Sequence, residues 1–170
     1  MGDQMNPLAF PLFIVGSWCG LYEVSRLEQG KWEGFNLARD LSGNKGIINL
    51  GCGPGRTVDA YVIAIDPQVL VNVDINPDGM PNFLQLDLER EHLPFSDKQF
   101  GCAFGSHVLE HLQDWEFALG EMARVADNVV LVLPYPASIS AFIHPGHWQH
   151  FSAEDMRDIE QRYPTVTILY

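Results

Sequence analysis

The chain of 170 residues has little cysteine and little positive charge. Its three cysteines, Cys19, Cys52 and Cys102, are an odd and widely spaced set, which argues against a disulfide framework and against a paired Cys-x-x-Cys zinc site. Ten basic residues stand against 22 acidic ones, a formal net charge of -12. A domain-wide basic surface for nucleic-acid phosphates or anionic lipid is therefore missing. We expect an acidic, cytoplasmic protein that does not bind nucleic acid.

An uninterrupted hydrophobic run is also missing. Residues 4–22 carry no charge, but two prolines and two glycines interrupt them, and no Lys or Arg precedes them to form a signal-peptide n-region. We expect residues 1–45 to form an N-terminal arm with cap helices and no membrane anchor. Residues 46–170 are expected to form the core of a single domain.

The spacing of apolar residues predicts an α/β fold. Short apolar runs bounded by Gly, Pro, Asn or Asp are typical of buried strands. Such runs occur at residues 46–50, 69–73, 82–86, 100–104, 128–133 and 165–170. Helical spacing occurs at residues 37–41, at residues 56–64, after Asp114 and after Ser152. Residues 87–99 hold a proline and are too few for a crossover helix, so an extended or single-turn connection is expected there.

A glycine-rich turn follows the first predicted strand, in the segment IINLGCGPGRT. Glycines let a ligand touch the backbone, and the start of a helix offers free N–H groups to an anion. A dinucleotide fingerprint would need Gly or Ala where Arg56 stands, and no Gly-Lys-Ser/Thr follows for a Walker loop. The turn therefore indicates an anion-binding site that is neither a dinucleotide site nor a Walker loop.

Asp74 ends the second predicted strand, about one β-α-β unit after the glycine turn. A carboxylate at that distance can accept hydrogen bonds from both hydroxyls of a ribose. A lone aspartate there could equally be a turn residue. The joint spacing of the two motifs favours ribose binding.

Five segments in order resemble the class I S-adenosylmethionine-dependent methyltransferases, in the branch with many small-molecule enzymes. They are IINLGCGPGRT, VNVDINP, LQLDLEREHLPFSDKQF, GSHVLEHL and EMARV. The resemblance implies a doubly wound, mostly parallel, Rossmann-like sheet with S-adenosylmethionine at the carboxyl ends of its strands. It also implies methyl transfer to an acceptor, which we expect to be a small molecule.

The resemblance further implies which residues contact the cofactor. The three glycines of the turn would wrap the methionine portion, Asp74 would hold the ribose, and Asp87 would accept from the adenine amine. Ser106 and His107 would border the methyl-transfer site. The expected cofactor-binding set is Asn49, Gly51, Cys52, Gly53, Gly55, Asp74, Ile75, Asp87, Leu88 and Ser106.

The sequence departs from the family pattern at four places. Asn49 stands where the family carries an acidic residue, Gly101 replaces a customary Phe-Asp, and residues 127–128 replace Pro-Gly-Gly. No sequence follows Tyr170 to form the seventh strand, so we expect a sheet shortened at its C-terminal end. These departures leave open a catalytically inactive, S-adenosylmethionine-binding regulatory domain.

Histidines supply candidate general bases, which only some methyl acceptors require. His144, His147 and His150 recur every third residue on the loop after the fifth predicted strand, which lies on the ligand side of an open α/β sheet. We expect the catalytic histidine to be His147, His150 or His107. The alternative is a structural loop whose histidines bond the backbone.

A metal site is not expected from the sequence. Glu110 directly precedes His111, so the pair does not fit His-Glu-x-x-His, although His107 lies one helical turn away. A histidine-based metalloprotein stays open as a distant alternative function. Cys52 and Cys102 lie in core-like positions and are not expected to act as nucleophiles.

Overall fold

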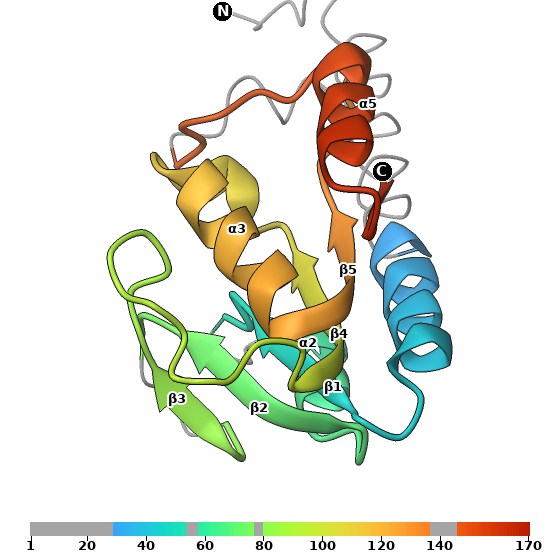
Figure 1. Cartoon of the computed structure of the whole chain (residues 1–170), viewed down its shortest axis with the longest axis vertical. Helices are drawn as coiled ribbons and strands as arrows, with labels where there is room; N and C mark the ends of the chain where they lie inside the picture. The colour runs from blue at the N-terminus through green and yellow to red at the C-terminus, as the bar shows by residue number, and fades with distance from the viewer. Residues whose placement is uncertain (1–28, 54–57, 77–79, 137–145) are drawn as a thin grey trace, which may run out of the picture.

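The computed structural model describes residues 29–53, 58–76, 80–136 and 146–170, and within them it confirms the α/β fold (Figure 1). All strand pairings are parallel, and the sheet order is β3-β2-β1-β4-β5-β6. The strands are β1 (Ile47–Leu50), β2 (Val69–Asp74), β3 (Phe83–Gln85), β4 (Phe100–Ser106), β5 (Ala126–Val132) and β6 (Val166–Leu169). Each of the six predicted strands is therefore present, with its ends shifted by at most a few residues.

The helices lie between these strands, as expected. They are a helix over residues 29–42, α2 (Val58–Ala64), the short 3-10 turn η1 (Leu109–His111), α3 (Trp115–Val125) and α5 (Ala153–Arg162). The first of them is much longer than the predicted residues 37–41. Gly30 and Gly34 weaken its helical propensity, but a Cβ at Gly34 would lie 2.4 Å from Val132. Close packing on β5 explains that glycine, which spacing alone does not reveal.

Two predicted N-caps are confirmed. The Asp114 side chain accepts a hydrogen bond from the Phe117 N–H at the start of α3. Ser152 and Asp155 form a reciprocal capping box at the start of α5. Both caps satisfy N–H groups that have no partner within the helix, and they fix where each helix begins.

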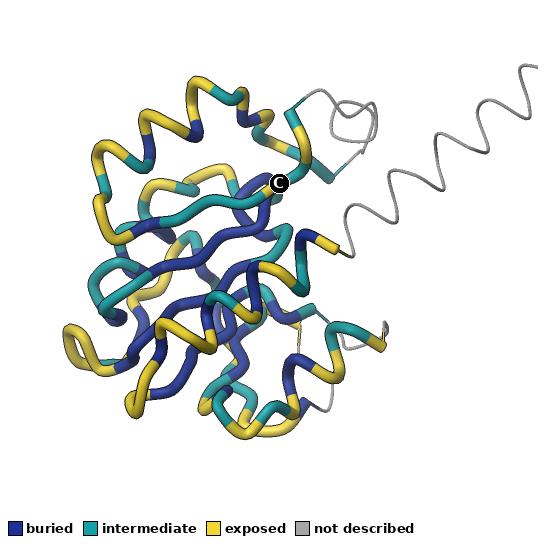
Figure 2. The backbone as a smooth tube through the Cα atoms, turned by 90° about the vertical axis from the view of Figure 1, so that its right-hand side faces the viewer, coloured by how far each residue is buried: buried dark blue, intermediate teal, exposed yellow. Residues whose placement is uncertain are grey.

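Helices cover both faces of the sheet and give it two hydrophobic cores (Figure 2). On one face the helix over residues 29–42 and α2 contribute Phe35, Ala38 and Ile63. On the other face α3 and α5 contribute a larger set, including Leu119, Met122 and Ile159. The central strands β1 and β4 are therefore buried on both sides, which is why they read as continuous apolar runs.

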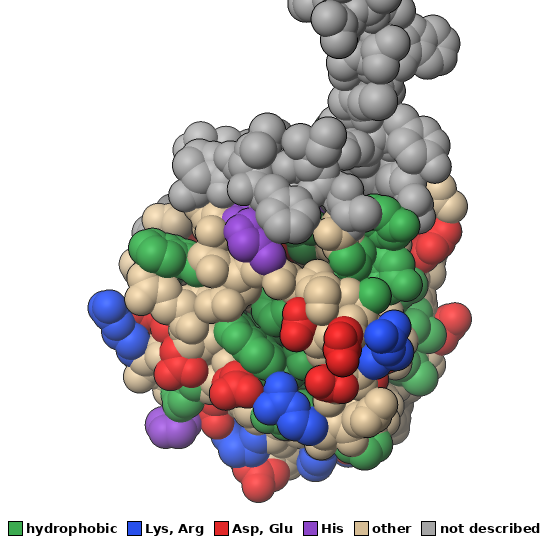
Figure 3. Space-filling model, turned by 90° about the horizontal axis from the view of Figure 1, so that it is seen from above, with side chains coloured by type: hydrophobic (Ala, Val, Ile, Leu, Met, Phe, Trp, Pro, Cys, Tyr) green, Lys and Arg blue, Asp and Glu red, His purple; other side chains and the backbone are tan. Residues whose placement is uncertain are grey.

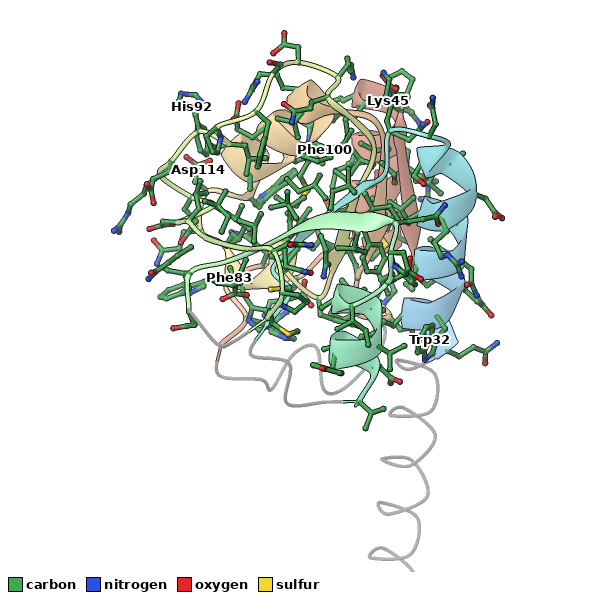
Figure 4. The ribbon with its side chains drawn as sticks, turned by 90° about the horizontal axis from the view of Figure 1, so that it is seen from below. Trp32, Lys45, Phe83, His92, Phe100 and Asp114 are labelled. Atoms are coloured by element: carbon green, nitrogen blue, oxygen red, sulfur yellow. The ribbon has the colours of Figure 1, made fainter. Side chains whose placement is uncertain are left out.

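A tryptophan connects the two helices that cover the first face. Trp32 extends from the helix over residues 29–42 toward α2 (Figure 4), and its Nε1–H donates to Asp59 Oδ1 at 3.2 Å. Phe100, at the start of β4, lies in the interior of the fold and is 2% exposed (Figure 4).

The segment before β4 is irregular, as predicted for residues 87–99. Arg124 of α3 donates to the carbonyls of Leu93 and Phe95, and Glu121 accepts from the Leu93 N–H. Side chains of α3 thus take the place of a helix in satisfying this backbone. Arg124 also bonds both carboxylate oxygens of Glu121.

The departure at Gly101 has a packing cause. A Cβ on Gly101 would lie 1.8 Å from the carbonyl oxygen of Ser42. The end of the helix over residues 29–42 therefore lies directly against β4, and the larger residue of the family pattern has no room. Packing against the end of this helix therefore explains the departure at Gly101.

Several predictions fall outside the described residues. These are the arm over residues 1–28, the third glycine of the turn, Gly55, and the loop histidine His144. In the described part of the chain, no helix has both the length and the apolar character needed to cross a membrane.

Candidate functional site

The strand order of the sheet reverses between β1 and β4, which is its topological switch point. Successive strands run outward from this point to opposite edges, and open α/β sheets bind ligands there, beyond the carboxyl ends of the strands. A cavity of about 500 Å³ lies at this position. Its lining includes Gly51, Gly53, Asp74, Ile75, Asp87, Leu88, His107, Val108 and His111. The structure thus brings six members of the expected cofactor-binding set to one cavity.

The glycine turn is shaped by two left-handed residues. Gly51 and Gly53 both have a φ of +64°, which side-chain-bearing residues rarely adopt. A Cβ on Gly51 would lie 2.4 Å from Val108 Cγ2, so this glycine also allows close packing. Nothing lies within 4 Å of a Cβ built on Gly53. Gly53 therefore leaves open space beside the cavity.

Two aspartates lie at the ends of neighbouring strands in the same cavity. Asp74 accepts from the N–H of Gly53 at 2.9 Å and from the N–H of Asn76 at 3.0 Å. Asp87 accepts from the N–H of Glu89 at 3.0 Å. Backbone groups thus hold both carboxylates in place, while each also lines the cavity.

A smaller cavity of about 40 Å³ lies next to the glycine turn. Asn49, Cys52 and Ser106, three more of the expected residues, line it together with Lys31. Asn49 is buried, and its Nδ2 donates to Asn72 Oδ1 at 2.8 Å. Burial, followed by the nearby Asp74 carboxylate, raises the pKa of the Cys52 thiol to about 12. Cys52 is therefore a thiol at neutral pH and not a nucleophile.

The half-buried His107 and the buried Glu110 form a pair beside the cavity of about 500 Å³. His107 Nδ1 lies 3.0 Å from Glu110 Oε1, and Glu110 is 1% exposed. In the neutral tautomer that donates from Nδ1 to Glu110, the lone pair of the His107 ring is on Nε2. The φ of His107 is +54°, an uncommon value for a residue with a side chain, of the kind that collects at functional sites.

Three buried polar atoms in the described residues lack a hydrogen-bond partner, and all three are here. They are Ser106 Oγ, His107 Nε2 and Glu110 Oε2. A buried polar group without a partner costs about 1–3 kcal/mol, so such groups are rare in folded proteins. Their concentration at one place indicates a site that a ligand completes.

A second cavity, of about 270 Å³, has a different lining. This lining is Glu110, Pro134, Pro136, His147, Gln149, His150, Phe151 and Ser152. Both remaining histidines of the predicted catalytic set therefore line this cavity and not the cavity of about 500 Å³. The backbone N–H groups of Trp148 and Gln149 donate to the Glu110 carbonyl at 2.8 and 3.1 Å. These bonds fix the histidine segment against η1.

Lys31 was missed by the sequence analysis, because it belongs to the part of the first helix that apolar spacing did not predict. Glu110 was considered in a metal motif that failed and as a reserve general base, but not as the buried partner of His107. Its apolar neighbours Val108, Leu109 and Leu112 are a signal that could have indicated a buried carboxylate.

Positive charge does not gather on the face shown in Figure 3. Lys and Arg side chains stand there singly among Asp and Glu. That face therefore offers no basic stripe of the kind that binds a nucleic-acid backbone.

Comparison with known proteins agrees with this geometry. A family model described as "Methyltransferase domain" matches residues 48–130. The fold is similar to that of a Thermotoga maritima S-adenosylmethionine-dependent methyltransferase described as a possible histamine N-methyltransferase. The TM-score is 0.55 and the identity 16%, over 84% of this chain and 76% of that one.

Two further solved structures share the fold. One is the complex of the Haloferax volcanii Trm112 methyltransferase activator with a putative methyltransferase, with a TM-score of 0.52 and 15% identity over 87% of this chain and 73% of that one. The other is a putative methyltransferase from Bacillus halodurans, with a TM-score of 0.52 and 17% identity over 77% and 66%. No curated protein sequence matches the chain.

Proposed function

We propose that the chain is a class I S-adenosylmethionine-dependent methyltransferase, which its domain match and its fold support, and that two of its cavities divide the substrates between them. The cavity of about 500 Å³ takes S-adenosylmethionine, and the cavity of about 270 Å³ takes a small-molecule acceptor. Glu110 and the neighbouring His107 lie where the two meet, which is where the methyl group must pass.

The residues of the larger cavity suit the parts of the cofactor. Asp74 accepts from the ribose hydroxyls, and Asp87 accepts from the adenine amine. Gly53 has no side chain and leaves open space at the methionine end, while its N–H holds the Asp74 carboxylate. The ammonium of Lys31, in the small inner cavity beside Asn49, balances the methionine carboxylate. A lysine there supplies the charge that Asn49 lacks.

The pair formed by the half-buried His107 and the buried Glu110 supports the proposal for the chemistry. When a hydroxyl or amine of the acceptor attacks the methyl carbon, the carbon–sulfur bond breaks and the sulfonium becomes a neutral thioether. The acceptor's proton passes to His107 Nε2, and the Glu110 carboxylate stabilises the imidazolium that forms. His147 and His150 contact the acceptor from the other wall, and either is the base if His107 is not.

The remaining expectations follow this proposal. A cavity of this size between two prolines and two histidines fits a small molecule better than a polymer. With a net charge of -12, nucleic acid is an unsuitable acceptor. We also propose a cytoplasmic location, where the methyl donor S-adenosylmethionine is present.

The experiment has two steps. Mass spectrometry of the purified protein identifies the ligand that it retains, and labelled S-adenosylmethionine is then offered with a panel of small hydroxyl and amine compounds. With an accepted compound, His107→Gln should lower kcat by about a hundredfold and leave cofactor affinity unchanged. His147→Ala and His150→Ala are the comparison variants.

The outcomes separate the alternatives. A large loss in His147→Ala or His150→Ala with full turnover in His107→Gln moves the base to the second cavity. Retained S-adenosylmethionine with no turnover on any compound favours the inactive regulatory domain. A retained nicotinamide dinucleotide contradicts the cofactor assignment.

A further inference from the structure

Three potential metal ligands from two separate segments meet at the boundary of the cavities. Glu110 and His111 belong to η1, and His147 follows β5 after a long connection. One ligand atom from each residue lies within 4.8 Å of the other two. The His111 and His147 rings lie 4.8 Å apart between centroids, at an angle of 72°. The sequence spacing did not predict this set because tertiary structure assembles it.

The carboxylate of Glu110 has one oxygen in use and one without a partner. Oε1 accepts from His107 Nδ1, whereas Oε2 is buried and has no hydrogen-bond partner among the described residues. A buried carboxylate oxygen in that condition is costly unless something positive completes it. A cation bound at Oε2 would complete it and leave the bond to His107 intact.

The ring of His111 is held in the tautomer that a metal requires. Its Nδ1 lies 2.8 Å from the carbonyl oxygen of Gly146. A carbonyl only accepts, so Nδ1 carries the hydrogen and the neutral ring has its lone pair on Nε2. Histidines that bind metals commonly donate their other ring N–H to a carbonyl in this manner.

The segment that carries His147 is fixed to the helix turn that carries the other two ligands. The N–H groups of Trp148 and Gln149 both donate to the Glu110 carbonyl, and Gly146 accepts from His111. His147 therefore approaches Glu110 and His111 from a backbone that is already anchored on both sides of it. Preorganised ligands of this kind lose little entropy when they bind a metal.

We propose that Glu110, His111 and His147 form a binding site for a divalent transition-metal ion such as Zn²⁺. Two imidazoles and one carboxylate are a ligand set that such ions take, with further positions left for water or a substrate oxygen. Ligands about 2.1 Å from a tetrahedral ion lie about 3.4 Å from one another. Side-chain rotations that move the ligand atoms by roughly an ångström bring them from their present separations of up to 4.8 Å to these distances.

The position of this site links the two cavities. His111 lines the larger cavity, and Glu110 and His147 line the smaller one. An ion there adds positive charge where the proposed acceptor lies, which lowers the pKa of a coordinated hydroxyl. The binding site itself does not depend on the proposed function, because metal affinity is measured without cofactor or acceptor.

The test is a titration of the untagged 170-residue protein with Co²⁺ and with Zn²⁺ after dialysis against a chelator. Calorimetry gives the stoichiometry and affinity, and the visible absorption of Co²⁺ reports its coordination. We expect one equivalent of each ion to bind and Mg²⁺ to bind at least tenfold more weakly.

Variants locate the ion. His147→Ala and Glu110→Gln should each weaken Co²⁺ binding at least tenfold and change its visible spectrum. His92→Ala is the matched control, since His92 is an exposed histidine at the outer edge of the molecule (Figure 4) and should leave affinity within twofold. Because Glu110 is buried, circular dichroism checks its variant, and the half-buried His147 provides the independent result.

Three results would overturn the proposal. They are the absence of stoichiometric Co²⁺ and Zn²⁺ binding, equal affinity in wild type and His147→Ala, and a loss of affinity in His92→Ala as large as that in His147→Ala. Binding of Mg²⁺ in preference to both other ions would contradict the assigned class of metal.

Discussion

Gly53 donates its backbone N–H to Asp74 Oδ2 at 2.9 Å, so the turn after β1 and the carboxylate after β2 are one hydrogen-bonded unit. The two groups lie 21 residues apart in sequence. A ligand that spans them therefore finds the aspartate already oriented by the same turn that leaves space for it.

Asp74→Ala should lower the affinity for S-adenosylmethionine by about 10- to 150-fold. This range corresponds to about 1.5–3 kcal/mol for lost hydrogen bonds to a charged group. Titration calorimetry measures it, with Asp127→Ala as control, because Asp127 pairs with Lys45 on the surface. Equal affinity in wild type and Asp74→Ala would contradict the ribose assignment.

Asp87→Ala should abolish discrimination between S-adenosylmethionine and its inosyl analogue. The analogue presents an acceptor where adenine has an amine, and the Asp87 carboxylate can bond only the amine. Competition binding with both compounds measures the ratio of affinities. Asp74→Ala should keep that ratio, since the two carboxylates contact different parts of the ligand; an unchanged ratio in Asp87→Ala makes the adenine assignment wrong.

Gly101→Ala should destabilise the fold by about 1–3 kcal/mol, as overpacking does. The new methyl group would lie 1.8 Å from the Ser42 carbonyl, and backbone there must move. Gly120→Ala is the matched control, because no atom lies within 4 Å of its Cβ and it belongs to α3. That variant should gain about 0.4–1 kcal/mol. Urea unfolding measures both, and equal stabilities would contradict the packing at β4.

Acid should remove the stabilisation that Glu121 provides. The side-chain hydrogen bond from Arg124 is the main cause that lowers the Glu121 pKa from 4.5 to about 2. A carboxyl with a lowered pKa stabilises fully above its unfolded value, and this contribution is lost as pH falls through the folded value. Wild type should therefore exceed Glu121→Gln in unfolding free energy at pH 6, and the difference should shrink between about pH 4.5 and pH 2. A difference that is constant with pH would show that the pair does not act through ionisation.

The parts of the fold that local signals determine could be predicted from the sequence. The strands, Asp114 and Ser152 were found because apolar runs and capping residues act over a few positions. The length of the first helix was underestimated because its glycines are explained by packing on β5, and local helical propensity carries no information on that packing. Lys31 was missed for the same reason.

The site divides in a similar way. Gly51, Gly53 and Asp74 lie at strand ends, where the spacing of a β-α-β unit predicts that they meet, and the family resemblance adds Asp87. The grouping of Glu110 with His107 and His147 depends on how the segment before α5 folds back on η1. No sequence spacing expresses that contact, so the histidines could be proposed but not assigned to cavities.

The contact between Gly51 and Val108 has a consequence for how the protein can evolve. Val108 stands between His107 and the helix turn that carries Glu110, and a Cβ on Gly51 would lie 2.4 Å from it. Any side chain at Gly51, or a bulkier one at Val108, displaces groups of the proposed donor and acceptor sites together. Under the proposed function, selection for a new acceptor has little freedom at this contact and must work through the opposite wall, formed by Pro134, His147 and His150.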